Sequence, residues 1–288
     1  MGIRPRELAS GEGWRVHDVS CDSGPRDRPF EERHASMCIA LVTWGSFQYR
    51  TASGSAVMAP GSLMLGNAGA CFSCGHEHRA GDRCLSFRFS PEYFERIVAA
   101  VPRARPEFKL PRLPPVQRLL PVLSEAQAVR DAVDLADPGG LADPDALQEL
   151  ALRVAGDVCA VLADDSSVCP GPSGRDERRV TTAVRRIEAQ AADRLSLHEL
   201  AREAAMSPYH FLRVFERVVG VTPGQYILRT RLRRAAALLR GSSLSVTRVA
   251  AECGFGDLST FIRQFRRAMC ASPNEYRARA RVSSSARG

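Results

Sequence analysis

Five potential metal ligands lie within fourteen residues of the sequence, in the segment CFSCGHEHRAGDRC at residues 71–84. They are Cys71, Cys74, His76, His78 and Cys84. A C-x-x-C pair followed by H-x-H is a spacing that closes around Zn²⁺ or another thiophilic ion. If the segment is a strand, Cys74, His76 and His78 project from one face, whereas Cys71 needs a turn or bulge to join them. Zinc is therefore a candidate cofactor.

Three interpretations of this cluster stay open at the level of sequence: a metal site, a thiol redox switch, and an unliganded polar loop with buried thiols. A labile metal site would make the protein a metal sensor. The H-x-H pair is similar to that of metal-binding cupin enzymes, whose pattern also needs a nearby glutamate and a second histidine strand. His17, His34 and His198 do not supply that strand in an obvious place. No nucleophile–base set, phosphate-binding glycine loop or carboxylate pair stands out, so we predict that the protein is not an enzyme.

A second set of chemistry-bearing residues lies near the C-terminal end, on the outward faces of two predicted helices. Arg213 and Arg263 occupy matching positions there. An arginine near the middle of a helix in the major groove donates two hydrogen bonds to guanine, worth about 1–3 kcal/mol of discrimination. Arg217 and Arg267 are expected to contact phosphates. The candidate DNA-binding residues are Tyr209, His210, Leu212, Arg213, Arg217, Leu258, Ser259, Ile262, Arg263 and Arg267.

These helices belong to an internal repeat, which defines the architecture of this part of the chain. The segment from Leu195 to Tyr226 maps onto the segment from Leu244 to Tyr276 with a shift of 49 residues, growing to 50 after Thr260. Each unit is predicted to form two short helices with a tight turn between them, that is, a helix-turn-helix module. Capping boxes mark helix starts at Ser196–Glu199, Thr222–Gln225 and Ser272–Glu275.

Apolar residues at helical spacing indicate which face of each outward helix is buried. Phe211, Phe215 and Val218 should pack inward in the first unit, and Phe261, Phe265 and Met269 in the second. A helix from Pro223 to about Leu239 joins the units and is roughly 25 Å long. With its flanking turns, it can hold two recognition helices about 34 Å apart, which is one turn of DNA.

The distribution of charge supports a nucleic-acid partner. Residues 175–288 carry 22 arginines against 10 acidic residues, a net charge of +12, whereas the rest of the chain has a net charge of −4. Positive charge confined to one part of a protein is typical of phosphate binding. A genome rich in G and C explains the scarcity of lysine but does not explain this asymmetry.

The carboxyl-terminal hundred residues resemble the DNA-binding domain of the AraC/XylS family of bacterial transcription regulators. The likeness is carried by the segment from Arg233 to Arg277, with its A-x-x-C-G-F turn, F-x-x-x-F helix and final S-P-x-x-Y-R. The resemblance implies base reading by Tyr209, Leu212, Arg213, Leu258, Ser259, Ile262 and Arg263. Leu212 and Ile262 stand where the family often has polar residues, so base reading at these two positions would be apolar or absent.

The amino-terminal part is rich in predicted strands from Trp14 to Phe89, punctuated by glycine and proline. Leu85, Phe87 and Phe89 should face one side of a strand, with Ser86 and Arg88 on the other. Helices are predicted over 91–100, about 116–136 and 144–163. The strand spacing suits a small antiparallel barrel or sandwich, and the family resemblance implies a cupin-like β-barrel followed by helices that mediate dimerisation.

The predicted fold class is therefore α+β: an N-terminal cupin-like β-barrel with trailing helices, and a C-terminal all-α domain of two helix-turn-helix modules joined by a long helix. The expected domains are a barrel sensor domain at 1–115, a helical dimerising segment at 116–165, a linker at 166–177, the DNA-binding domain at 178–280 and a disordered tail at 281–288. The linker expectation rests on a stretch rich in Ser, Pro, Gly and charge.

Nine cysteines, no signal peptide and no apolar stretch long enough to span a bilayer predict free thiols, a cytoplasmic location and no membrane partner. Cys159, Cys253 and Cys270 lie on apolar helix faces and are expected in the core.

We interpret the chain as a homodimeric, sequence-specific transcription regulator of operator DNA. By family analogy, it is an activator that contacts RNA polymerase and responds to an unknown effector, with metal and redox signals as candidates. Two alternatives are a non-specific architectural DNA binder and a metal-dependent cupin enzyme fused to a DNA-binding domain.

Overall fold

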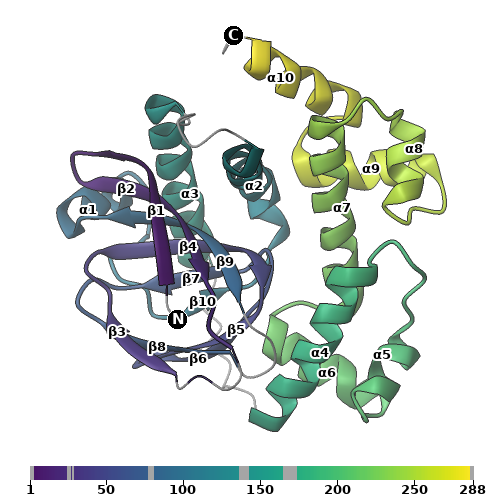
Figure 1. The fold of residues 1–288 in the computed structure, drawn as a ribbon, viewed down its shortest axis with the longest axis horizontal. Helices are drawn as coiled ribbons and strands as arrows, with labels where there is room; N and C mark the ends of the chain where they lie inside the picture. Colours follow the sequence, from purple (N-terminus) through teal and green to yellow (C-terminus); the bar gives the residue numbers. More distant parts are fainter. Residues whose placement is uncertain are drawn as a thin grey trace.

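The computed structural model describes residues 3–24, 27, 29–76, 81–135, 143–164 and 174–285. These residues form an N-terminal β-sheet domain with trailing helices and a C-terminal all-helical domain beside it (Figure 1). His78, most of the expected linker and the last three residues of the expected tail lie outside the described residues.

Two antiparallel sheets make up the N-terminal domain within the described residues. The first has six strands in the order β1 (Ile3–Gly11), β2 (Trp14–Cys21), β9 (Asp82–Phe89), β4 (Met37–Gly45), β7 (Leu63–Gly66) and β10 (Arg112–Leu113). The second has four strands in the order β3 (Phe30–Arg33), β8 (Cys71–Gly75), β5 (Phe47–Thr51) and β6 (Gly54–Met58). The predicted β-rich domain is confirmed, and β1 adds a strand that the sequence pattern missed.

The predicted barrel is wrong in one respect, because the described strands form two separate sheets and do not close. The chain leaves the first sheet at Gly45, which has a φ of +80°, and begins the second at Phe47. This sharp turn ends the pairing of β4 with β9 before any ladder to β5 forms. The sheets are held face to face by an apolar cluster between them, so the arrangement is a sandwich.

Strand β9 shows why both faces of the first sheet are buried. Leu85, Phe87 and Phe89 pack in the cluster that contains the trailing helices, as predicted. Ser86 and Arg88 face the other way, into the space between the sheets. The covering helices are α1 (Pro91–Ala99), α2 (Leu120–Leu135) after a short 3₁₀ turn η1 (Gln117–Leu119), and α3 (Pro144–Asp164). Their bounds match the predicted helices to within a few residues.

The C-terminal domain contains the two predicted helix-turn-helix modules. Its helices are α4 (Gly174–Gln190), α5 (Leu197–Glu203), α6 (Pro208–Val219), α7 (Pro223–Gly241), α8 (Val246–Glu252), α9 (Leu258–Met269) and α10 (Pro273–Ser285). The three predicted capping boxes are present as hydrogen-bonded pairs. Helix α4 begins inside the stretch expected as linker, and α10 extends four residues past the expected start of the tail.

Two residues with positive φ, Gly254 and Cys270, follow helices α8 and α9 of the second module. Gly254, with a φ of +79°, makes the turn after α8, as the sequence predicts. Cys270 ends α9 in the left-handed conformation and is exposed, so the expectation of a core cysteine is wrong there. Cys159 and Cys253 are buried, as expected. In the described part of the chain, no helix is both long and apolar enough to cross a membrane.

Candidate nucleic-acid interface

Helix α6 presents one polar and one apolar face, as a helix that inserts into a groove must. Phe211 and Phe215 are fully buried, with ring centroids 5.5 Å apart, and Val218 continues their row. On the opposite side, the Tyr209 side chain is 70% exposed. His210, Arg213 and Arg217 are also exposed, and Leu212 is half-buried at the edge. All predicted contact residues of α6 therefore lie on or beside one accessible face.

Helix α9 repeats this arrangement in the second module. Phe261, Phe265 and Met269 pack inward, as predicted. Leu258 and Ile262 are large apolar residues, yet each is 37% exposed. Together with Ser259, Arg263 and Arg267, they lie on the outward face, and a shallow surface hollow runs along its arginines. An exposed isoleucine on an arginine-rich face suits contact with a thymine methyl group.

Arg213 and Arg263 occupy equivalent exposed positions in the two modules. Among the described residues, the Arg213 guanidinium has no hydrogen bond or ion pair, and Arg263 has a hydrogen bond of 3.4 Å to Thr260 Oγ1. Their guanidinium groups are therefore available to an external acceptor. Helices α6 and α9 lie at opposite ends of α7, and α5 and α8 lie on the side away from the β-sheets (Figure 1).

The arginines of α7 are used inside the protein, which the charge count does not reveal. Arg231 donates from Nε to the Ala191 carbonyl oxygen at 2.6 Å and from Nη2 to the Asp193 carbonyl oxygen at 2.9 Å. Arg234 donates to the Glu188 carbonyl oxygen. These groups satisfy the carbonyls at the C-terminal end of α4 and stabilise its dipole. Part of the positive charge of this domain is thus structural.

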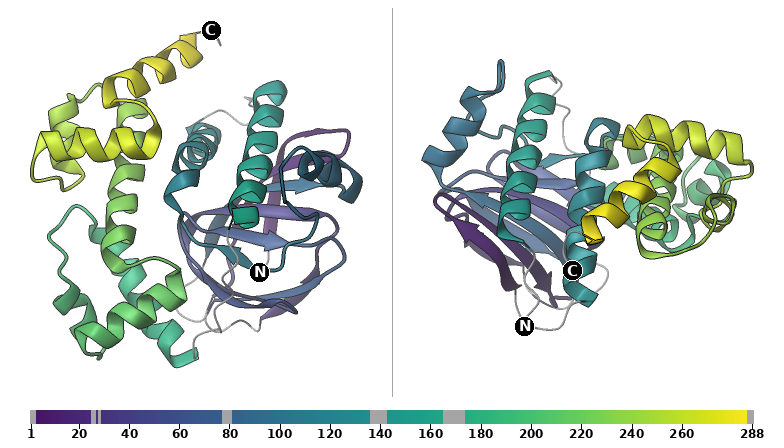
Figure 2. Two further views of the ribbon diagram at one scale, coloured as in Figure 1. Left: turned by 180° about the vertical axis from the view of Figure 1, so that it is seen from behind. Right: turned by 90° about the horizontal axis from the view of Figure 1, so that it is seen from above.

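The N-terminal domain lies beside the helical domain (Figure 2), and the predicted contact residues Tyr209, Arg213 and Arg263 stay exposed. Val57 and Ala59, at the end of β6, join the apolar cluster of the first module. Leu120 of α2 joins the cluster of the second module. Arg112 is half-buried between the domains, where it donates to the carbonyl oxygens of Val57 and Val218.

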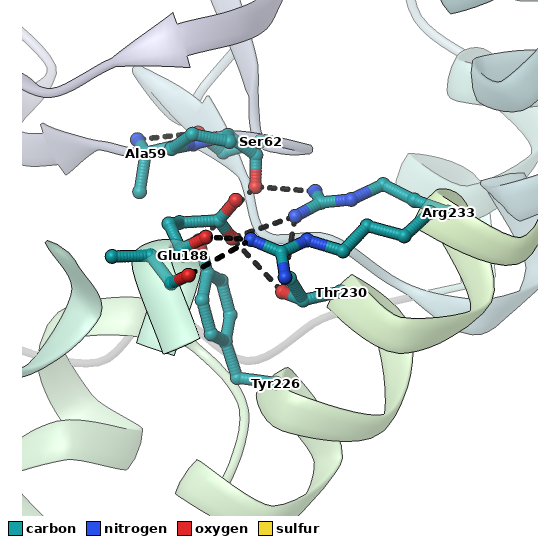
Figure 3. A network of polar contacts seen from close by, with 9 residues as sticks. Ala59, Ser62, Glu188, Tyr226, Thr230 and Arg233 are labelled. Atoms are coloured by element: carbon teal, nitrogen blue, oxygen red, sulfur yellow. Dashed lines mark hydrogen bonds and ion pairs between the residues drawn. The ribbon is translucent and has the colours of Figure 1, made fainter. Parts of the chain in front are cut away.

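A polar network joins the turn after β6 to α4 and α7 (Figure 3). Arg233 donates from Nη1 to the Pro60 carbonyl oxygen at 2.5 Å and from Nη2 to Glu188 Oε1 at 2.7 Å. The Tyr226 hydroxyl also donates to the Pro60 oxygen, at 3.2 Å, and Thr230 donates to Glu188 at 2.9 Å. Because the Arg233 and Glu188 side chains are only 16% and 25% exposed, the network is largely shielded from water, which strengthens its hydrogen bonds between the two domains.

A cavity of about 150 Å³ lies between the two sheets of the N-terminal domain. The structure places three of the five predicted metal ligands on its wall: Cys74, His76 and Cys84. Cys74 and His76 share a face, as alternation predicts, while Cys71 points out of the sheet and is exposed. His78 lies outside the described residues.

Two further cavity residues were missed at the sequence level. Cys21 ends β2 and Asp82 begins β9, and the two are directly opposite each other in the ladder. His76 Nε2 is 2.5 Å from Asp82 Oδ1, and the His76 ring also hydrogen-bonds with Cys21. Burial opposes protonation of His76, but its hydrogen bonds with Asp82 and Cys21 outweigh burial and raise its pKa to about 9. Only the strand register could have linked these residues, and it is not readable from the sequence.

Residues 200–279 match the helix-turn-helix domain family. The chain is 47% identical over 79 residues to the HTH-type transcriptional regulator Rv1931c of Mycobacterium tuberculosis, covering 27% of this chain and 30% of that protein. It is 34% identical over 91 residues to the HTH-type transcriptional activator AarP of Providencia stuartii, covering 32% of this chain and 67% of that protein. Apart from AarP, the chain spans about a third of the length of curated relatives such as Rv1931c.

Among solved structures, the chain is similar to the DNA-binding domain of AdpA in complex with a target DNA. The identity is 31% and the TM-score is 0.36, and the match covers 36% of this chain and 95% of that chain. It is also similar to an AraC-type regulator from Chromobacterium violaceum, with 30% identity, 38% and 96% coverage, and a TM-score of 0.35. Two helix-turn-helix modules on one spacer helix define a DNA-binding protein of the double-module class. The sequence matches go further: the chain belongs to the AraC family of helix-turn-helix transcription regulators.

Proposed function

We propose that the protein regulates transcription by inserting α6 and α9 into two successive major grooves of an operator. The observation that carries this proposal is the pair Arg213 and Arg263, exposed at equivalent positions of two modules that α7 holds at its opposite ends. Helix α7 has 19 residues, which gives it a length of about 28 Å. With the turns that flank it, this length suits grooves about 34 Å apart on one side of a duplex.

Each contact residue has a role that its chemistry allows. Arg213 and Arg263 donate paired hydrogen bonds to guanine O6 and N7. Arg217 and Arg267, one turn further along each helix, neutralise phosphates, and such contacts make binding weaken with salt. Leu212 and Ile262 contact thymine methyl groups. The helix starts at Tyr209, His210, Leu258 and Ser259 approach base edges or the backbone.

We propose the rest of the regulatory cycle from the cavity and the family. The N-terminal domain binds an effector in the cavity between its sheets, and metal or redox signals are the candidate classes because cysteine and histidine line that cavity. The protein acts in the cytoplasm as a homodimer through its trailing helices. It activates transcription through contact with RNA polymerase, and the similarity to AarP, which is named a transcriptional activator, supports activation.

Selection of bound duplexes from a random pool, followed by affinity measurements on the selected sequence, tests the proposal. Arg213→Ala and Arg263→Ala should each lose about 1–3 kcal/mol of preference for guanine at one position, in different halves of the site. Arg118→Ala is the control, because it removes one exposed positive charge in the N-terminal domain, where Arg118 pairs with Asp164 at 2.6 Å.

The same measurement separates the alternative functions. An architectural DNA binder would select no sequence, and Arg213→Ala would weaken its affinity for every duplex equally. A metal-dependent enzyme fused to a DNA-binding domain would show turnover that is independent of DNA. We propose a regulator without enzymatic activity, since the paired recognition faces explain the exposed residues of the helical domain.

A further inference from the structure

We infer that the wall of the cavity between the sheets is a binding site for a thiophilic divalent cation of the Zn²⁺ class, held by Cys21, His76 and Asp82. A sulfur, a nitrogen and an oxygen ligand atom, one from each residue, all lie within 4.8 Å of one another. All three residues are buried, with relative exposures of 7%, 5% and 6%. Thiolate, imidazole and carboxylate are the ligands that zinc takes in proteins.

The site is formed by both sheets, which distinguishes it from the sequence motif that first suggested a metal. Cys21 and Asp82 come from neighbouring strands of the six-stranded sheet, and their side chains share the face toward the cavity. His76 follows β8 of the four-stranded sheet. Of the sequence motif, only His76 enters this set, while Cys71 points outward. A bound ion would therefore join the two sheets of the sandwich.

The fourth ligand is available from one of two neighbouring thiols. Cys74 and Cys84 line the same cavity, and Cys84 Sγ is 3.6 Å from Asp82 Oδ2. Zinc sites with two thiolates, one imidazole and one carboxylate are tetrahedral, with ligand distances of about 2.0–2.3 Å.

Binding requires a small local rearrangement and a release of protons. His76 Nε2 and Asp82 Oδ1 are hydrogen-bonded to each other at a distance of 2.5 Å. Two such ligands on one tetrahedral ion lie about 3.3 Å apart, so the pair must part by about 0.8 Å. The S–H bonds of Cys21 and of the fourth-ligand thiol and the Nε2–H bond of His76 break, and these three protons pass to the solvent. Two metal–sulfur bonds, one metal–nitrogen bond and one metal–oxygen bond form in their place.

The site is placed to influence the helical domain, a consequence that rests on the function proposed above. Gly75 precedes His76 and lines a narrow crevice with Thr181 and Arg185 of α4. Arg185 donates from Nε to Ser46 Oγ at 3.3 Å, at the turn between the two sheets. The His76 ring lies beside that of Phe47, with centroids 5.8 Å apart, and Phe47 follows Ser46 in the chain, so a change in the position of His76 reaches the first helix of the DNA-binding half through this turn.

Titration of the full-length, reduced and metal-free protein with Co²⁺ tests the site, because cobalt reports its ligands in its absorption spectrum. We expect one ion per chain, with intense visible bands of tetrahedral Co²⁺ and a thiolate-to-cobalt transition in the near ultraviolet. Zn²⁺ should displace it. Cys21→Ser and Asp82→Asn should each weaken binding at least tenfold. Asp82→Asn preserves shape, so it remains informative if Cys21→Ser does not fold.

Cys71→Ser is the matched control, since it removes an exposed thiol of the same motif and should bind Co²⁺ as the unaltered chain does. The inference is overturned if no saturable binding occurs, if Cys21→Ser and Asp82→Asn bind as tightly as the parent, or if Cys71→Ser abolishes binding. Operator affinity of the metal-free protein is measured separately. If the protein binds its operator but gives no cobalt signal, the metal site alone is refuted. If it gives the cobalt signal but selects no operator, the DNA proposal alone is refuted.

Discussion

Gly61 and Gly69 form a matched pair that measures the contact between the two domains. Both have positive φ, +87° and +77° respectively. A Cβ atom at Gly61 would lie 1.8 Å from Arg233 Nη1, whereas nothing lies within 4 Å of one at Gly69. Alanine therefore introduces the same backbone strain at both positions, but only at Gly61 does it displace the arginine that binds the Pro60 carbonyl oxygen.

The expected magnitude follows from these two contributions. A left-handed alanine costs about 1–2 kcal/mol at either position. Displacing Arg233 removes a charge-assisted hydrogen bond, worth about 1.5–3 kcal/mol. Gly61→Ala should therefore lower the free energy of unfolding by about 2 kcal/mol more than Gly69→Ala does.

Urea unfolding, followed by tryptophan fluorescence and circular dichroism, provides the assay. Both tryptophans, Trp14 and Trp44, lie in the N-terminal domain, whereas circular dichroism also follows the helices of the C-terminal domain. The reasoning is refuted if the two variants differ by less than about 0.5 kcal/mol, because the contact between Arg233 and the turn would then contribute nothing to stability.

Two further predictions concern the second module and the N-terminal domain. Gly254→Ala adds a Cβ 2.2 Å from the Ala192 carbonyl oxygen at a φ of +79°, so we expect it to cost about 3 kcal/mol of stability and to abolish tight operator binding. Gly256→Ala, with open space around it, should stay within about 0.5 kcal/mol of the parent. Equal effects of the two substitutions in calorimetry would count against the assigned turn. Burial, with a smaller effect of Arg88, lowers the pKa of His34 from 6.5 to about 4, so protonation favours the unfolded chain. Stability should therefore fall by about 3 kcal/mol as the pH drops from 6.5 to 4. His34→Gln should remove that part of the pH dependence in urea titrations, and an unchanged dependence would be the contrary outcome.

The features that the sequence predicted correctly are those set by local interactions. The capping box of Ser196 and Glu199 depends on residues three apart, and the structure contains both of its hydrogen bonds. Inward and outward faces of α6 and α9 follow from the 3.6-residue period. In β9, Leu85 and Arg88 fall on opposite faces because a strand alternates. Each of these features needs only one short segment to be known.

The features that sequence could not predict depend on how distant segments pair. Cys21 and Asp82 are 61 residues apart, and only the register of β2 with β9 brings them together. The separation of the sheets depends on the turn at Gly45, which is indistinguishable from other strand ends in the sequence. The charge count likewise could not separate Arg213, whose side chain is exposed, from Arg231, which donates to a carbonyl oxygen at the end of α4.

Footprinting of the selected operator with hydroxyl radicals tests the central claim, that one chain places two recognition helices in successive grooves. We predict two protected patches for each bound chain, about 10 base pairs apart and on the same side of the duplex. Arg213→Ala should weaken one patch and Arg263→Ala the other. A single patch, or two patches on opposite sides of the duplex, would contradict the arrangement of α6 and α9 at the ends of α7.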